Sequence, residues 1–518
     1  MGNGATLYVS TRAHPRLYPM PLVFALRSDF KPVRAILLNK SSGFRYSLVD
    51  GSPQLRQIGA DESSVAEGAL PSSSRDGVLD LYQQVASAEF FQELRQELKL
   101  KSRRRIFDLP LVVWLMMVQR WDAKATLWTA VQQVVQQRPA ALLSDHKRIR
   151  EGRVSGHTGA YSDARQEMPV EVAQRVADRI FEHLLPRARR EALPGWNRRV
   201  FILDGSSVDL AHTRELVQAY PPGSNQHGES HWPVLKLLVA QELTSGLAGR
   251  PCWGPMYGPE AVSEQALTEK ILDRLPEASV LMGDINFGVF SVAYASTQGR
   301  HDVLFRLQED RAATLGRGGP LQPGTDRRVC WRPSAYERRQ HPQLPADACV
   351  PGRLIVEQVT ASNGQSVILY FFTTLDLEVK QLLALYGDRW NVETDLRSLK
   401  QTLRLQTLRC QSPDMVAKEL VLAIAGYNLV RAVMQVAAEE QKIDPRRLSF
   451  SRSQDVVNAA LPGLDAARTA EEYQTRLRRM FQLVSSCKLP ARRRRATTPR
   501  TVWGHSCKFP KRKATPVL

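Results

Sequence analysis

Residues 199–208 read Arg199-Val200-Phe201-Ile202-Leu203-Asp204-Gly205-Ser206-Ser207-Val208. The unbroken apolar run is typical of a strand that is buried on both faces of a sheet. A charged side chain at the end of such a strand is costly unless it is paired or binds a metal ion. The stretch therefore predicts a core strand whose aspartate, Asp204, needs a partner.

A second short apolar run also ends in an aspartate. It reads Val280-Leu281-Met282-Gly283-Asp284 and leads through Asn286 to a Gly-containing turn and a predicted helix. Either aspartate taken alone could simply cap the next helix or order a turn. Two such strand ends, joined by a third acidic position further along the chain, favour a common site instead.

The third acidic position lies in a predicted helix that spans 382–403. Tyr386, Arg389, Glu393 and Lys400 fall within about 60° of one another at about 100° of helical rotation per residue, so a ring, a carboxylate and two cations share one helix face. A separate apolar stripe would pack this helix against the core. For the charged face on its own, a solvated surface with salt bridges is the alternative interpretation.

Three carboxylates that converge from two strands and a helix would repel one another. Hard divalent cations such as Mg²⁺ or Mn²⁺ compensate such a group of oxygen ligands at the least cost. Two such ions about 4 Å apart can generate a nucleophile and stabilise the leaving oxygen without a covalent protein intermediate. The pattern therefore predicts metal-dependent phosphoryl transfer.

The spacing of the helix positions resembles the signature of a known family, the DDE transposases of bacterial insertion-sequence family four. That signature is Tyr, two residues, Arg, three residues, Glu, six residues and Lys, and the chain reproduces it in full. The segment Asp204-Gly205-Ser206-Ser207 resembles the family's first aspartate motif, and Asp284 followed by Phe287 and Gly288 resembles the second. Asn286 departs from the glycine often found in the second motif, which concerns the geometry of the turn and not the carboxylate.

The resemblance implies roles for six side chains. The residues implied to be catalytic and to bind two Mg²⁺ or Mn²⁺ ions are Asp204, Asp284 and Glu393. Those implied to contact DNA phosphates near the cleaved bond are Tyr386, Arg389 and Lys400. Cations in such positions can neutralise a scissile phosphate and the charge that develops on it.

The resemblance also implies an α/β fold, with an RNase H-like mixed sheet flanked by helices. The apolar pattern predicts an N-terminal helical domain before this sheet and a β-rich insertion within it. An Asn363-Gly364 pair between two β-rich runs predicts a hairpin inside the insertion. The expected parts are a poorly ordered extension and linker (1–77), a helical DNA-binding domain (78–195), the catalytic domain (196–440) with its insertion (301–376), and a C-terminal helical segment with a basic tail (441–518).

The net charge and the cysteine spacing indicate which kind of partner the protein binds and in which cellular compartment it works. The net charge of +19 indicates a polyanionic partner, and the acidic positions favour DNA over a membrane surface. Residues 481–518 hold +10 of this charge and no acidic side chain. The six cysteines show no metal-ligand or disulfide spacing, and no apolar stretch fits a signal peptide or a membrane span. We therefore expect a soluble cytoplasmic protein, associated with the nucleoid when bound to DNA.

Together these features predict a DNA transposase that hydrolyses a phosphodiester at each end of an insertion sequence and transfers the freed strand to target DNA. Its partner would be double-stranded DNA, both as terminal inverted repeats and as target, and the resemblance implies a homodimer on DNA. Two alternatives stay open. One is a catalytically inactive, transposase-derived DNA-binding regulator, and the other is a nuclease of the same fold that does not transfer strands.

Overall fold

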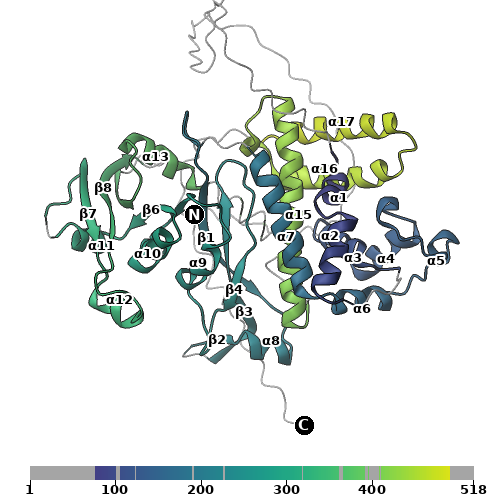
Figure 1. The fold of residues 1–518 in the computed structure, drawn as a ribbon, viewed down its shortest axis with the longest axis horizontal. Helices are drawn as coiled ribbons and strands as arrows, with labels where there is room; N and C mark the ends of the chain where they lie inside the picture. Colours follow the sequence, from purple (N-terminus) through teal and green to yellow (C-terminus); the bar gives the residue numbers. More distant parts are fainter. Residues whose placement is uncertain are drawn as a thin grey trace, which may run out of the picture. The chain divides into compact units, whose positions relative to one another are not determined.

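The computed structural model of the protein describes residues 76–489 (Figure 1). Within this range it omits 101–105, 123, 189–191, 226–227, 318, 361–365, 391–394, 396–398, 400–407 and 409. Two predicted site residues, Glu393 and Lys400, therefore lie outside the described residues. The same holds for most of the predicted N-terminal extension, up to residue 75, and for the basic tail from residue 490.

Helices make up the part of the described chain that precedes the first strand. They are α1 (Val78–Val85), α2 (Ala88–Glu97), α3 (Leu109–Gln119), α4 (Leu127–Val135), α5 (Lys147–Arg150), α6 (Gly159–Glu167) and α7 (Val170–Leu184), with the 3-10 turns η1 (Ala140–Leu142) and η2 (Leu185–Arg187). Every residue of α3 from Leu111 to Val118 is buried, as expected of a helix that is apolar all round. The helical character predicted for this region is thereby confirmed.

A mixed sheet of nine strands follows. The strands are β1 (Val200–Asp209), β2 (Pro222–Asn225), β3 (Gly228–Glu242), β4 (Cys252–Pro255), β5 (Val280–Gly283), β6 (Asp302–Leu307), β7 (Thr325–Trp331), β8 (Val350–Thr360) and β9 (Ser366–Thr373). Their order is β2-β3-β1-β5-β6-β9-β8-β7, and β4 pairs with β3. The strands β1, β5 and β6 are parallel, and all other pairs are antiparallel.

The strand-rich region from 302 to 373 continues this sheet. β6 pairs in parallel with β5, and β9, β8 and β7 extend the sheet from β6 by antiparallel pairing. The predicted hairpin is confirmed, because β8 and β9 pair from Arg353–Thr373 to Thr360–Ser366. Its Asn-Gly turn lies outside the described residues. The exact bounds of the insertion and of the other domains remain predictions.

Helices flank the sheet and complete the described chain. They are α8 (Arg214–Ala219), α9 (Glu264–Leu272), α10 (Phe290–Gln298), α11 (Glu309–Leu315), α12 (Ala335–Gln340), α13 (Val379–Gly387), α15 (Pro413–Glu440), α16 (Phe450–Asp465) and α17 (Ala470–Ser486), with the 3-10 turns η3 (Asp388–Trp390) and η5 (Pro445–Arg447). α9 packs on β1, β3, β4 and α10, whereas α15 lies beside α7 and also contacts α3 (Figure 1).

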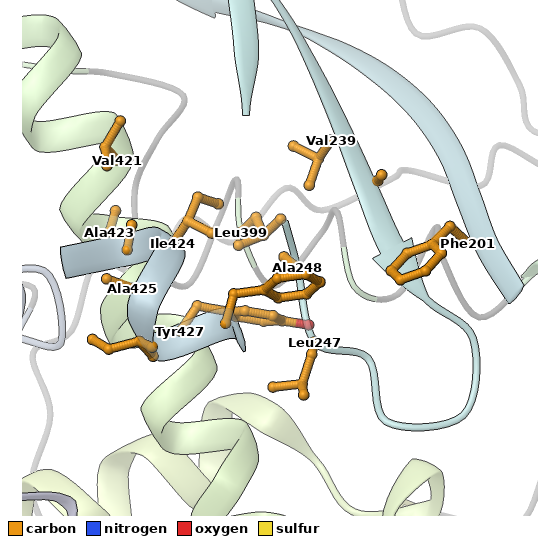
Figure 2. Packing of buried hydrophobic residues seen from close by; sticks show 14 of the residues in the cluster. Phe201, Val239, Leu247, Ala248, Leu399, Val421, Ala423, Ile424, Ala425 and Tyr427 are labelled. Carbon is orange, nitrogen blue, oxygen red and sulfur yellow. The ribbon is translucent and has the colours of Figure 1, made fainter. Parts of the chain in front are cut away.

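α15 joins the helical part to the sheet. Among the described helices it alone is long and apolar enough to cross a membrane, but 94% of its most apolar window is buried inside the protein, as in a core helix. The Asn428 side chain bonds the backbone N–H and C=O of Ala248 at 2.9 and 2.8 Å, and the Tyr427 hydroxyl donates to Gly246 O at 3.0 Å. Figure 2 shows this core. Val239 of β3, Ile424 of α15 and Leu399, which precedes α15, belong to one hydrophobic cluster.

The prediction of one continuous helix over 382–403 is wrong. α13 ends at Gly387, and the 3-10 turn η3 follows it. Gly and Asp are weak helix formers, and Gly387-Asp388 stands where the α-helix stops. Tyr386 and Arg389 therefore lie on successive elements and not on one α-helical face.

Candidate active site

The sheet register brings the two predicted aspartates together. In the parallel pair β1 and β5, Val200 is opposite Val280 and Ile202 is opposite Met282. Asp204 lies two residues further along β1, and Asp284 is the residue directly after the end of β5. The Asp284 carboxylate raises the pKa of Asp204, so the two side chains are near each other. Because neighbouring strands lie about 4.8 Å apart, residues at the same level of the two strands are direct neighbours.

The Asp204 side chain is largely buried, next to other charged groups. The pKa of its carboxyl rises from 3.8 to about 6, mainly because the side chain is buried and also because the carboxylates of Asp284 and Glu264 are near. The Gly205 N–H, which donates to Asp204 Oδ1 at 2.9 Å, and the Arg389 guanidinium act in the opposite direction on this pKa. Such a group of acidic side chains has a strong electrostatic preference for cations.

Glu264 is an acidic residue at this site that we did not predict from the sequence. It is the first residue of α9, behind the N-cap Ser263. Its carboxylate covers Gly205, where an ideal Cβ would lie 2.1 Å from Glu264 Cδ. The sequence shows an N-cap serine before a helix, but no spacing rule connects this helix start with Asp204.

Tyr386 and Arg389 lie beside the two aspartates. Both are buried, and Arg389 Cζ lies 5.6 Å from the centre of the Tyr386 ring, within the range of a cation–π contact. Burial raises the pKa of the Tyr386 hydroxyl, the nearby Arg389 and Arg306 lower it, and Asp284 raises it. Four of the six predicted side chains, two acidic ones and this Tyr–Arg pair, are thus close to one another.

Two comparisons with known proteins bear on the family of this chain. A family model described as "Transposase DDE domain" matches residues 195–429. Transposase InsG for insertion sequence element IS4 of Escherichia coli (strain K12) is 26% identical over 370 residues, which make up 68% of this chain and 77% of that protein. Both findings support an IS4-family DDE transposase. The predicted family and the RNase H-like α/β fold class are thereby confirmed.

The family implies that the transposase depends on divalent metal ions, and the donor chemistry of the site fits them. Asp204 and Asp284 supply carboxylate oxygens, the ligands that Mg²⁺ and Mn²⁺ prefer, in a place where negative charge is incompletely balanced. Among the described residues, no group of three His, Cys, Asp or Glu side chains is arranged to hold a metal ion. The predicted third ligand, Glu393, lies outside these residues.

Buried contacts anchor the transposase chain close to Glu393 in the sequence. Asp395 is 2% exposed and forms ion pairs with Arg431 of α15 and, at 2.7 Å, with Arg446 of η5. Arg431 Nε also donates to the Tyr427 hydroxyl at 2.8 Å. Asp395, two residues after Glu393 in the sequence, is therefore fixed to α15 and η5. We did not foresee this role for Asp395, because the burial of its partners depends on the tertiary fold.

In the metal-free transposase, Asp204→Asn is expected to increase stability above about pH 6 and to have little effect below about pH 4. The pKa of Asp204 is higher in the folded state than the ordinary 3.8, so ionisation of this carboxyl at neutral pH opposes folding. Below about pH 4 the carboxyl is largely protonated in the folded and the unfolded state, and the effect on stability disappears. The shift to about 6 corresponds to a gain of at most about 3 kcal/mol.

Urea unfolding in the presence of EDTA, at about pH 4 and about pH 7.5, measures this effect. The exposed Asp376 provides the matched control, and Asp376→Asn should not alter the pH dependence of stability. A gain from Asp204→Asn that is equal at both pH values would show that the pKa of Asp204 is not raised by folding.

Proposed function

We propose that this transposase cuts DNA at the ends of an insertion sequence and joins the freed ends to target DNA. Hydrolysis of a phosphodiester at each element end would expose a 3′ hydroxyl, which would then attack the target at the same site. The observation that supports this most is the parallel register of β1 and β5, which brings Asp204 next to Asp284, with Arg389 nearby.

The catalytic, metal-binding residues in this proposal are Asp204, Asp284 and Glu393, and the cofactor is a pair of Mg²⁺ or Mn²⁺ ions. Ions bound there would supply activation of the attacking oxygen and stabilisation of the leaving oxygen. The contribution of the chain is to hold its carboxylates in place. Asp204 is carried by the core strand β1, and Asp284 directly follows the core strand β5. Sites built on such elements are more precise than sites on loops.

The residues proposed to contact DNA are Tyr386, Arg389 and Lys400. A guanidinium can form two parallel hydrogen bonds to a phosphate, and its charge can balance the charge that develops during the reaction. Because Arg389 is buried beside the aspartates, its interaction with a bound phosphate would be only weakly screened by solvent. The proposed partner is double-stranded DNA, with two copies of the chain acting on the two element ends.

A cleavage and joining assay with the purified protein tests this function. We expect Mg²⁺-dependent nicking of DNA that carries the terminal inverted repeats, followed by covalently joined donor and target DNA. DNA binding without any cleavage in Mn²⁺ would instead identify a regulator. Cleavage without joined products would identify a nuclease.

We expect Arg389→Gln and Lys400→Gln each to weaken DNA binding and to flatten its salt dependence. Each lost phosphate contact should reduce the slope of log K against log salt concentration by about 0.9. Fluorescence anisotropy across a salt series measures this slope. Lys380→Gln, on an exposed position of α13, removes the same charge elsewhere and serves as the control. If both site variants keep the wild-type slope, these residues do not contact phosphates.

A further inference from the structure

The first turn of α9 contacts both of the segments that carry the site aspartates. Glu264 opens this helix, and its carboxylate lies against the backbone of Gly205, the residue after Asp204. Oε1 of this carboxylate is the oxygen near Gly205, and Oε2 accepts a hydrogen bond from Asn286 Nδ2 at 2.5 Å. Glu264 therefore bridges the β1 segment and the turn that follows β5.

Asn286 is held from several directions. Gln265 Nε2 donates to the backbone oxygen and to the side-chain oxygen of Asn286, both at 2.8 Å. The Asn286 N–H in turn donates to Asp284 Oδ1 at 2.9 Å, which orients that carboxylate. Glu264, Gln265 and Asn286 thus form a chain of hydrogen bonds that ends on a predicted metal ligand; we call this group the α9 clamp.

A simpler role would be that Glu264 only stabilises its own helix. A carboxylate in the first turn of a helix interacts favourably with the helix dipole, typically by about 0.3–1 kcal/mol. That role needs no partner outside the helix. It does not explain why the Glu264 side chain contacts Gly205 and Asn286. The observed contacts reach both segments, and a glycine at 286 could not donate the side-chain hydrogen bond.

We propose that Glu264 is a positioning residue that sets the relative placement of Asp204 and Asp284 through the α9 clamp. This inference rests on the proposed function, because it assigns those aspartates to a common metal site. Partners that orient metal ligands typically contribute about 10- to 100-fold to metal affinity or activity. The clamp acts through shape and hydrogen bonding, so an uncharged side chain of the same shape should largely replace Glu264.

Isothermal titration of the full-length protein with Mn²⁺ tests this role independently of turnover. Glu264→Ala should weaken Mn²⁺ binding by about 10-fold or more, whereas Glu264→Gln, which keeps an acceptor oxygen for Asn286, should lose much less. Adding Asn286→Ala to Glu264→Ala should cause little further loss, since the two residues act in one unit. Glu269→Ala, on an exposed position of the same helix, is the control and should bind Mn²⁺ like the wild type.

Three outcomes would overturn the inference. Wild-type Mn²⁺ affinity in Glu264→Ala would leave Glu264 with a role in its own helix only. Equal losses in Glu264→Gln and Glu264→Ala would show that the charge itself is needed. Additive losses in the double variant would separate Glu264 from Asn286. Asp204→Asn in the same titration tests the underlying function: if it binds Mn²⁺ normally, or if the wild type binds none, the proposed metal site fails together with the clamp.

Discussion

Asp204→Asn and Asp284→Asn are each expected to reduce Mg²⁺-dependent DNA cleavage by about three orders of magnitude. Each exchange replaces a carboxylate with a neutral amide of the same shape, at positions that the β1–β5 register places side by side. Metal ions stabilise the charge of a phosphoryl-transfer reaction by several kcal/mol, and about 1.4 kcal/mol corresponds to a tenfold change in rate. Single-turnover cleavage of DNA that carries the element ends measures the loss.

Measuring the DNA affinity of the same variants separates a loss of catalysis from a loss of DNA binding. Because the aspartates carry negative charge, their loss should leave DNA binding intact or slightly tighter. Asp376→Asn, at an exposed position, should cleave like the wild type. Cleavage within tenfold of wild type in both Asp204→Asn and Asp284→Asn would remove these residues from the catalytic centre.

Asp395→Ala is expected to lower the free energy of unfolding by about 3–5 kcal/mol. The variant would leave the buried guanidinium groups of Arg431 and Arg446 without their carboxylate partner, and an uncompensated buried charge is strongly destabilising. Cleavage by the folded fraction should also fall, since Asp395 lies only two residues after Glu393 in the sequence. Urea unfolding followed by circular dichroism measures the change in stability.

A more exposed ion pair provides the control for Asp395. Asp326 pairs with Arg353 at 2.6 Å, but 39% of its side chain is exposed, so Asp326→Ala should cost less than about 1 kcal/mol. If Asp395→Ala and Asp326→Ala lower the free energy of unfolding by equal, small amounts, the ion pairs of Asp395 stabilise the fold no more than an ion pair at the surface does.

The two aspartates of the site could be predicted from the sequence because the patterns that mark them are local. An apolar run that ends in aspartate marks both a core strand and a place where charge is costly, and this applies to Asp204 and to Asp284 alike. The register of β1 against β5 could not be predicted, since the pairing of parallel strands depends on segments that are far apart in the chain.

The remaining parts depend on tertiary structure. Helical periodicity alone predicted one helix over 382–403, but the α-helix ends at Gly387, so propensity at one position outweighed the pattern. Glu264 and Asp395 look like ordinary surface charges in the sequence. Their roles arise from partners such as Gly205 and Arg431, which sequence spacing does not connect with them.

A structure of the transposase bound to element-end DNA in Mn²⁺ would show whether the three carboxylates share a pair of metal ions. We expect anomalous density for Mn²⁺ within about 2.0–2.2 Å of carboxylate oxygens from Asp204, Asp284 and Glu393, next to the scissile phosphate. Mn²⁺ bound elsewhere, or a Glu393 carboxylate too distant from the two aspartates to share an ion with them, would contradict this expectation.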